Sequence, residues 1–103
     1  MIELHAEMRL HGVARGGLGN PVKNGLRPSF SYAGELVACE VWAEGVGVDG
    51  LVPIESSVRA RIRLPYADQL GWSFVGGERF ELNIASQVIG EGSVMSVIGP
   101  GAA

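Results

Sequence analysis

Residues 2–11 have the sequence IELHAEMRLH, in which apolar and polar side chains alternate without a break. The apolar side chains share one face of such a segment: Ile2, Leu4, Ala6, Met8 and Leu10. An alternation of period two places successive side chains on opposite faces of a β-strand. The pattern therefore predicts a strand with one buried and one wet face.

Other segments of the chain have the same strand-like character. They are residues 35–44, 58–64, 79–89 and 93–98, with PSFSY at 28–32 as a further short candidate. Residues 65–78 are expected to form a loop with at most one helical turn, around 67–70. The chain holds 16 glycines and five prolines, which exclude long helices.

Strands that each bury one face favour an all-β fold, and we predict a small closed antiparallel Greek-key barrel of about six strands. Closure would remove the exposed sheet edges. The stretch GGLGNPVKNGLRPSF at 16–30 provides the long crossing that a Greek key needs. We expect residues 1–98 to form this single domain and residues 99–103 to form a disordered tail. The predicted core contains Leu4, Met8, Val41, Ile62, Leu64, Phe80, Leu82 and Ile84.

Charge and cysteine content narrow the classes of function. The formal net charge of −3 argues against a protein that mainly holds nucleic acid through its phosphates. A single cysteine, Cys39, excludes an internal disulfide and fits a reducing compartment. No signal peptide or membrane-spanning apolar run is visible. We therefore expect a cytoplasmic protein that does not interact with membranes.

No catalytic, cofactor or metal motif survives inspection. GVGVDG at 45–50 fits G-x-G-x-x-G, but Pro53 follows where a helix should begin, so a hairpin loop is favoured. His5 and His11 could bind a metal with nearby glutamates, yet a solvated strand face is the favoured interpretation. Cys39 alternates with valines and fits a core position. We predict that the protein is not an enzyme and has no cofactor or metal.

One strand face carries Arg59, Arg61 and Arg63, spaced about 7 Å apart. This arginine stripe is either a surface for an acidic partner or a solvated face. In the second, favoured case it pairs across strands with acidic residues, the candidates being Glu3, Glu7, Glu40 and Glu81.

Trp42 shares its predicted face with Leu36 and Ala38, so that face is either covered by loops or forms a partner or homo-oligomer interface. Arg27 lies in the long crossing, the other stretch where we place a partner surface. The candidate partner-binding residues are Arg27, Trp42, Arg59, Arg61 and Arg63.

The 16–30 stretch resembles the start of the third, C-terminal β-barrel domain of elongation factor Tu. The matching positions are Gly16, Gly17, Pro21, Gly25, Arg27, Pro28 and Phe30. Residues 77–94, GERFELNIASQVIGEGSV, are similar to the closing motif of the same domain. They match at Gly77, Arg79, Phe80, Leu82, Val88, Gly90, Gly92 and Val94. The likeness spans roughly residues 2–98 and implies a stand-alone relative of that domain.

The resemblance also has implications for function. Basic residues that the family uses around transfer RNA are replaced here by Leu18, Gly19, Ser86 and Gln87, which disfavours RNA binding. The family's nucleotide-binding domain has no counterpart in this sequence, so GTP hydrolysis is not expected. The resemblance implies a non-catalytic module that recognises another protein, in a sharper form as a mimic or decoy of the factor. The alternative is an RNA-binding accessory protein of translation.

Overall fold

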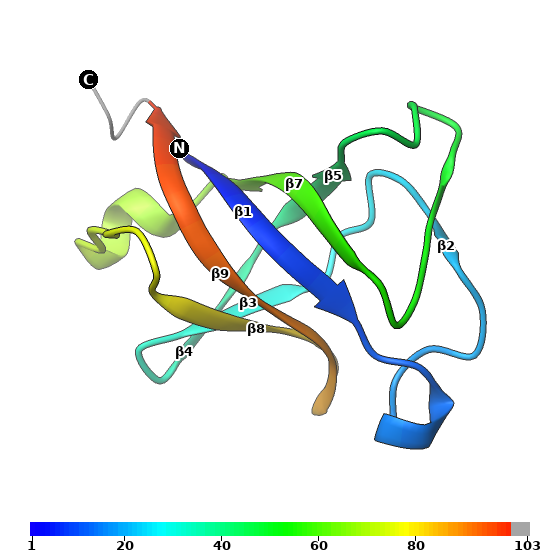
Figure 1. Ribbon diagram of the computed structural model, residues 1–103. Coiled ribbons are helices and arrows are strands. Elements are labelled where there is room, and N and C mark those ends of the chain that lie inside the picture. The colour runs from blue at the N-terminus through cyan, green and yellow to red at the C-terminus, as the bar shows by residue number, and fades with distance from the viewer. Residues whose placement is uncertain (100–103) are drawn as a thin grey trace.

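The computed structural model describes residues 1–99, which form an all-β structure with two short 3-10 helices (Figure 1). The strands are β1 (Ile2–Leu10), β2 (Val22–Lys23), β3 (Ser29–Tyr32), β4 (Glu35–Ala38), β5 (Glu40–Ala43), β6 (Leu51–Val52), β7 (Ser57–Leu64), β8 (Arg79–Ile84) and β9 (Gln87–Gly99). The 3-10 helices are η1 (Val13–Arg15) and η2 (Ala67–Leu70). The predicted strands at 2–11 and 58–64 and the turn at 67–70 are confirmed.

Seven strands form one sheet in the order β4-β3-β8-β9-β1-β7-β5, and β2 pairs with β6 in a small second sheet. Neighbouring strands of the main sheet are antiparallel. The long strands β1 and β9 run side by side through its middle, and the sheet curls around the core into a half-barrel (Figure 1).

The predicted closed barrel is wrong, because the sheet curls without closing. Residues 35–44, expected as one strand, form β4 and β5, which are separated at Cys39. β4 pairs with β3, whereas β5 pairs with β7, so the two halves lie at opposite edges of one sheet. The backbone at Cys39 therefore connects the two edge strands directly. β4 and β5 do not form hydrogen bonds with each other that would close the sheet into a barrel, because they follow one another end to end along the chain.

The core confirms seven of the eight predicted positions, and the exception is Ile84. The seven buried side chains are Leu4, Met8, Val41, Ile62, Leu64, Phe80 and Leu82. Ile84 is 51% exposed. The pairing of β8 with β9 shifts register between Leu82 and Asn83, and the chain turns at Ala85, whose φ is 55°. This turn also divides the strand that we expected over residues 79–89.

The loop between η2 and β8 covers the core with aromatic side chains. Trp72 and Phe74 lie with ring centroids 6.2 and 6.0 Å from the fully buried Phe30, which stacks on Phe80 at 4.6 Å. The loop expected at 65–78 therefore contributes to packing.

The last strand reaches the end of the described residues. β9 extends to Gly99, and the rest of the expected tail, residues 100–103, lies outside the described residues. No helix within residues 1–99 has the length and apolar character needed to cross a membrane.

Candidate functional site

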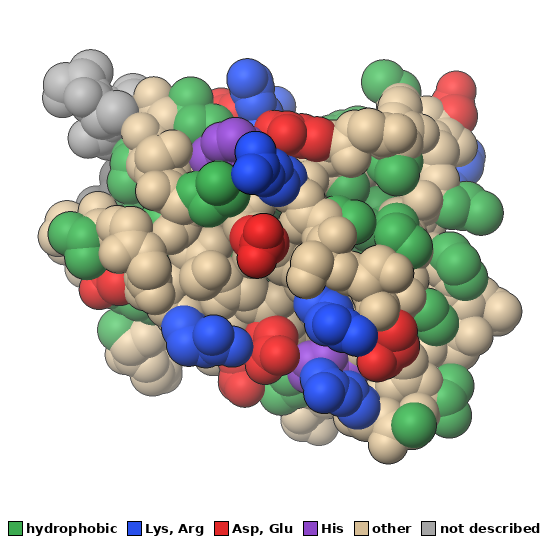
Figure 2. Space-filling view, in the orientation of Figure 1, with side chains coloured by type: hydrophobic (Ala, Val, Ile, Leu, Met, Phe, Trp, Pro, Cys, Tyr) green, Lys and Arg blue, Asp and Glu red, His purple; other side chains and the backbone are tan. Residues whose placement is uncertain are grey.

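The arginine stripe lies on the outer face of β7, which is flanked by β1 and β5. Arg61 and Arg63 are opposite His5 and Glu3 of β1, and Arg63 is also opposite Glu40 of β5. Acidic side chains of β1 and β5 therefore lie beside the arginine stripe, which fits the interpretation that the stripe pairs across strands with acidic residues. Figure 2 shows the result, with charged side chains of both signs spread over the face that carries β1.

Three of the predicted residues meet at the carboxylate of Glu40. The indole Nε1–H of Trp42 donates to Glu40 Oε1 at 2.7 Å, and Arg27 Nη2 lies 3.2 Å from Glu40 Oε2. Arg63 Nη1 lies 3.6 Å from Glu40 Oε1. The Trp42 hydrogen bond, helped by the charges of the two arginines, holds the pKa of Glu40 below its ordinary value.

A second carboxylate, that of Glu3, completes the cluster. Glu3 Oε2 lies 3.6 Å from Arg61 Nη1, and Glu3 Oε1 lies 4.0 Å from Arg63 Nε. Arg63 therefore links the two carboxylates. We call the whole group the Glu40 site, and it consists of Glu3, Arg27, Glu40, Trp42, Arg61 and Arg63.

Three of the acidic and basic candidates, Glu7, Arg59 and Glu81, lie outside the Glu40 site. Arg59 is exposed opposite Glu7 and makes no ion pair within residues 1–99. Glu81 is not a neighbour of the stripe, because β8 places it opposite Ser31 and Glu91. The fold brings together four of the five predicted partner-binding residues, namely Arg27, Trp42, Arg61 and Arg63, and their role in binding a partner stays a prediction.

Gly25 explains how Arg27 reaches Glu40 from the long crossing. Gly25 has φ +83°, and a Cβ there would lie 2.8 Å from Cη2 of Trp42. The crossing can therefore lie flat against the indole ring. Its backbone is tied to β5 by the N–H of Val41, which donates to the Leu26 carbonyl at 2.8 Å. The crossing therefore covers part of the half-buried Trp42 side chain, whereas Leu36, which the sequence placed on the same face, is 56% exposed.

The two kinds of charge lie at different depths. The carboxylate side chains of Glu3 and Glu40 are 21% and 20% exposed, whereas the Arg27, Arg61 and Arg63 side chains are 78%, 59% and 45% exposed. The guanidinium groups therefore form the outer layer of the Glu40 site, and the carboxylates lie beneath and hold them.

Two hollows are lined by residues of the Glu40 site. One, of about 360 Å³, is lined by Glu3, Trp42, Arg61 and Arg63. The other, of about 340 Å³, is lined by Arg27, Ala38, Cys39, Glu40, Pro65 and Tyr66. Nothing in the sequence pointed to Pro65 and Tyr66, because a loop residue becomes part of a surface only through its tertiary neighbours.

Cys39 is a buried core residue, as its alternation with valines predicted. Its Sγ–H donates to the Pro28 carbonyl at 3.3 Å. Burial raises the pKa of the thiol to about 12, so the nucleophilic thiolate is scarcely populated at neutral pH.

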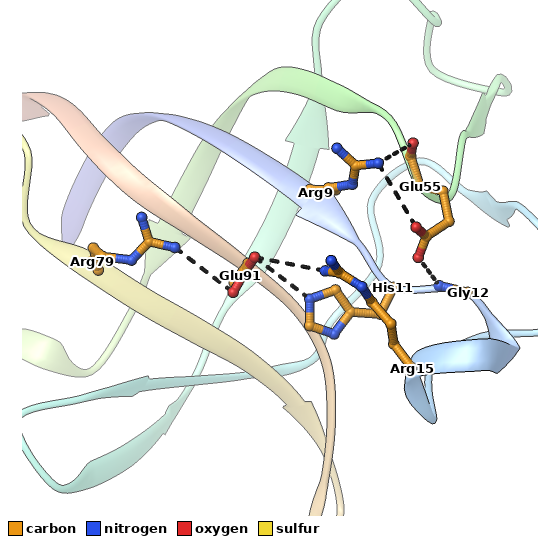
Figure 3. Close-up of polar contacts among 7 residues, drawn as sticks. All are labelled: Arg9, His11, Gly12, Arg15, Glu55, Arg79 and Glu91. Atoms are coloured by element: carbon orange, nitrogen blue, oxygen red, sulfur yellow. Dashed lines mark hydrogen bonds and ion pairs between the residues drawn. The ribbon is translucent and has the colours of Figure 1, made fainter.

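A second charged cluster surrounds Glu91 at the other end of β1 (Figure 3). Glu91 lies 3.7 Å from Arg79, 3.8 Å from His11 and 4.0 Å from Arg15. The expected solvated position of His11 is wrong, because β1 ends at Leu10 and His11 is only 9% exposed. Within residues 1–99, no group of three or more histidine, cysteine or acidic side chains is arranged to hold a metal ion.

Glu55, which lies between β6 and β7, connects this part of the chain to the corner formed by the end of β1 and Gly12. Its Oε1 accepts the Gly12 N–H at 2.7 Å, and its carbonyl accepts from Arg9 Nη2 at 2.9 Å (Figure 3). The Gly12 hydrogen bond is the main reason why the pKa of Glu55 is lowered. The nearby hollow of about 140 Å³ is lined mostly by charged and serine side chains and has no aromatic one. These contacts hold a corner together, so the Glu40 site is the better candidate for binding.

No protein-family profile matches this chain, and no curated protein sequence matches it. Two of the motif positions noted in the sequence, Gly92 and Phe80, pack against each other. A Cβ on Gly92 would lie 2.6 Å from Cζ of Phe80, and Phe80 stacks on Phe30. These positions therefore report on how the chain packs, and the function has to be argued from the Glu40 site.

Proposed function

We propose that this chain is a non-catalytic protein-recognition module and that the Glu40 site is its docking surface. The observation that supports it most is the convergence of Arg27, Trp42 and Arg63 on the Glu40 carboxylate, with Arg61 held next to them by Glu3. Arginine, tryptophan and tyrosine are the residues most enriched among interface hot spots. Tyr66, 63% exposed at the rim, adds the third of these types.

The arrangement also reduces the entropic cost of binding. Long arginine side chains lose rotamer freedom when a partner immobilises them, at about 0.5–1.5 kcal/mol each. Here Arg63 is already held between two carboxylates, at 3.6 Å from Glu40 and 4.0 Å from Glu3. A partner that docks on the Glu40 site would meet arginines that are largely in place.

For the fold, we propose kinship with the third domain of elongation factor Tu, as a stand-alone Greek-key relative in the cytoplasm. The order and spacing of the matched glycine and aromatic positions support this proposal, as does an all-β chain that places Phe30 and Phe80 together in its core. On this proposal the docking surface is a protein-binding face. The most specific version of the proposal is that the chain mimics the factor or acts as its decoy.

Capture from a native lysate, compared between variants, tests the proposed function. The Arg61→Gln/Arg63→Gln protein should lose the partners that the wild type retains. An Arg15→Gln/Arg79→Gln protein is the matched control, because it removes two exposed arginines from Glu91 instead. Equal capture by the Arg61→Gln/Arg63→Gln protein would refute the docking surface. Capture that disappears after ribonuclease treatment would instead favour the RNA-binding alternative.

A further inference from the structure

Three hollows that share lining residues lie along the Glu40 site, and we call them together the trough. A third hollow of about 220 Å³, lined by Met1, Glu40, Arg63 and Pro65, lies between the two already described. It shares Arg63 with the hollow at Trp42, and it shares Glu40 and Pro65 with the hollow at Tyr66. A ligand that follows this trough must be elongated.

The two ends of the trough differ in chemistry. At one end the outer layer consists of the guanidinium groups of Arg61 and Arg63, which are 59% and 45% exposed. Each guanidinium has five N–H donors in a fork that suits a carboxylate, and the contacts with Glu3 and Glu40 occupy only part of them. The other end, which Arg27 and Glu40 also line, has an apolar wall made by Ala38, Pro65 and Tyr66.

We propose that the Glu40 site binds an extended acidic peptide segment of its partner, with a carboxylate over Arg61 and Arg63 and an apolar side chain in the hollow at Tyr66. This inference rests on the proposed function and adds the class of ligand. Charge complementarity selects the acidic segment, because three guanidinium groups lie outside two carboxylates. The aliphatic part of the wall, Ala38 and Pro65, suits an apolar side chain of a peptide, and the net charge of −3 disfavours a polynucleotide.

Trp42 offers a direct reporter for the test. The protein has two tryptophans. The indole N–H of Trp42 is bonded to Glu40, whereas Trp72 packs in the aromatic cluster with Phe30. In ¹⁵N-labelled protein the two indole signals are assigned with the Trp42→Phe variant, and the Trp72 signal serves as an internal control.

Three synthetic peptides with blocked ends separate the two parts of the proposal. ELELE carries both features, QLQLQ lacks the charge and EGEGE lacks the apolar side chains. We expect ELELE to shift the Trp42 signal, with weaker binding at high salt. Binding of QLQLQ and binding of EGEGE should each be weaker by about tenfold, the factor that corresponds to 1.4 kcal/mol.

Variants of the protein connect the effect to named side chains. Arg61→Gln/Arg63→Gln should weaken ELELE binding by about tenfold or more, with Arg79→Gln unchanged. Tyr66→Ser should weaken ELELE binding and leave EGEGE binding as it is.

Equal binding of ELELE and QLQLQ, or of ELELE and EGEGE, would overturn the inference. Absence of any Trp42 shift at millimolar peptide would overturn it as well, and so would self-association that involves the Glu40 site. The proposed function would survive each of these results if lysate capture still depended on Arg61 and Arg63. It would fail separately if capture did not depend on them.

Discussion

Glu40→Gln is the most informative single substitution, because it removes one negative charge and keeps an oxygen that can accept from Trp42. Hydrogen bonds to charged groups contribute about 1.5–3 kcal/mol and neutral ones about 0.5–1.5 kcal/mol, so the bond to Trp42 should weaken by about 1 kcal/mol. Loss of the ion pairs with Arg27 and Arg63, whose side chains are 78% and 45% exposed, adds about 0–1 kcal/mol. We expect the free energy of unfolding to fall by about 1–2 kcal/mol.

Urea denaturation followed by far-UV circular dichroism measures this change, and the pH dependence gives it a signature. The pKa of Glu40 is lowered from an ordinary 4.5 in the folded protein. Its contribution to stability is therefore fully present above pH 4.5 and is lost as the pH falls through the folded-state pKa. The difference between wild type and Glu40→Gln should be constant near neutral pH and shrink below pH 4.5.

Glu35→Gln is the matched control, since Glu35 is exposed on the edge strand β4. It should change the free energy of unfolding by less than about 0.5 kcal/mol. Two results would refute the reasoning on Glu40. One is an unchanged free energy of unfolding in Glu40→Gln at pH 7, and the other is a difference that stays the same down to pH 3.

Two further substitutions, Gly92→Ala and Glu55→Ala, and one labelling reaction at Cys39 test the packing. Gly92→Ala would place a methyl group against the backbone carbonyl of Glu7 and 2.6 Å from Cζ of Phe80, and it should lower the free energy of unfolding by about 1–3 kcal/mol in urea denaturation. Gly19→Ala, where the methyl group would make only ordinary contact, should be near neutral. The Cys39 thiol, buried with its pKa raised to about 12, should react with a disulfide reagent at pH 8 only after unfolding in guanidinium, and rapid labelling of the native protein would contradict this. Glu55→Ala should lower the melting temperature, because it leaves the Gly12 N–H without its acceptor, and an unchanged melting temperature would contradict the role of Glu55 at this corner.

Alternation in the sequence predicted the strands that run through the middle of the sheet. β1 and β7 keep period two over most of their length, so Leu4, Ile62 and Leu64 could be assigned to the core directly. Alternation failed where the pairing is irregular. Ile84 follows a register shift, and His11 follows the end of a strand, so each lies on the opposite side from the one its position implied.

The sequence by itself determined that the long strands each bury one face and that the arginine stripe faces outward, because both follow from local alternation of side chains along a strand. Only the tertiary structure decided that the segment at Cys39 divides between two edges and that Arg27 and Trp42 meet Arg63 at Glu40. Those residues are separated along the chain, and their contact depends on which strands pair and in which register. Alternation within one strand says which face is buried, but it does not say which other strand will be its neighbour in the sheet.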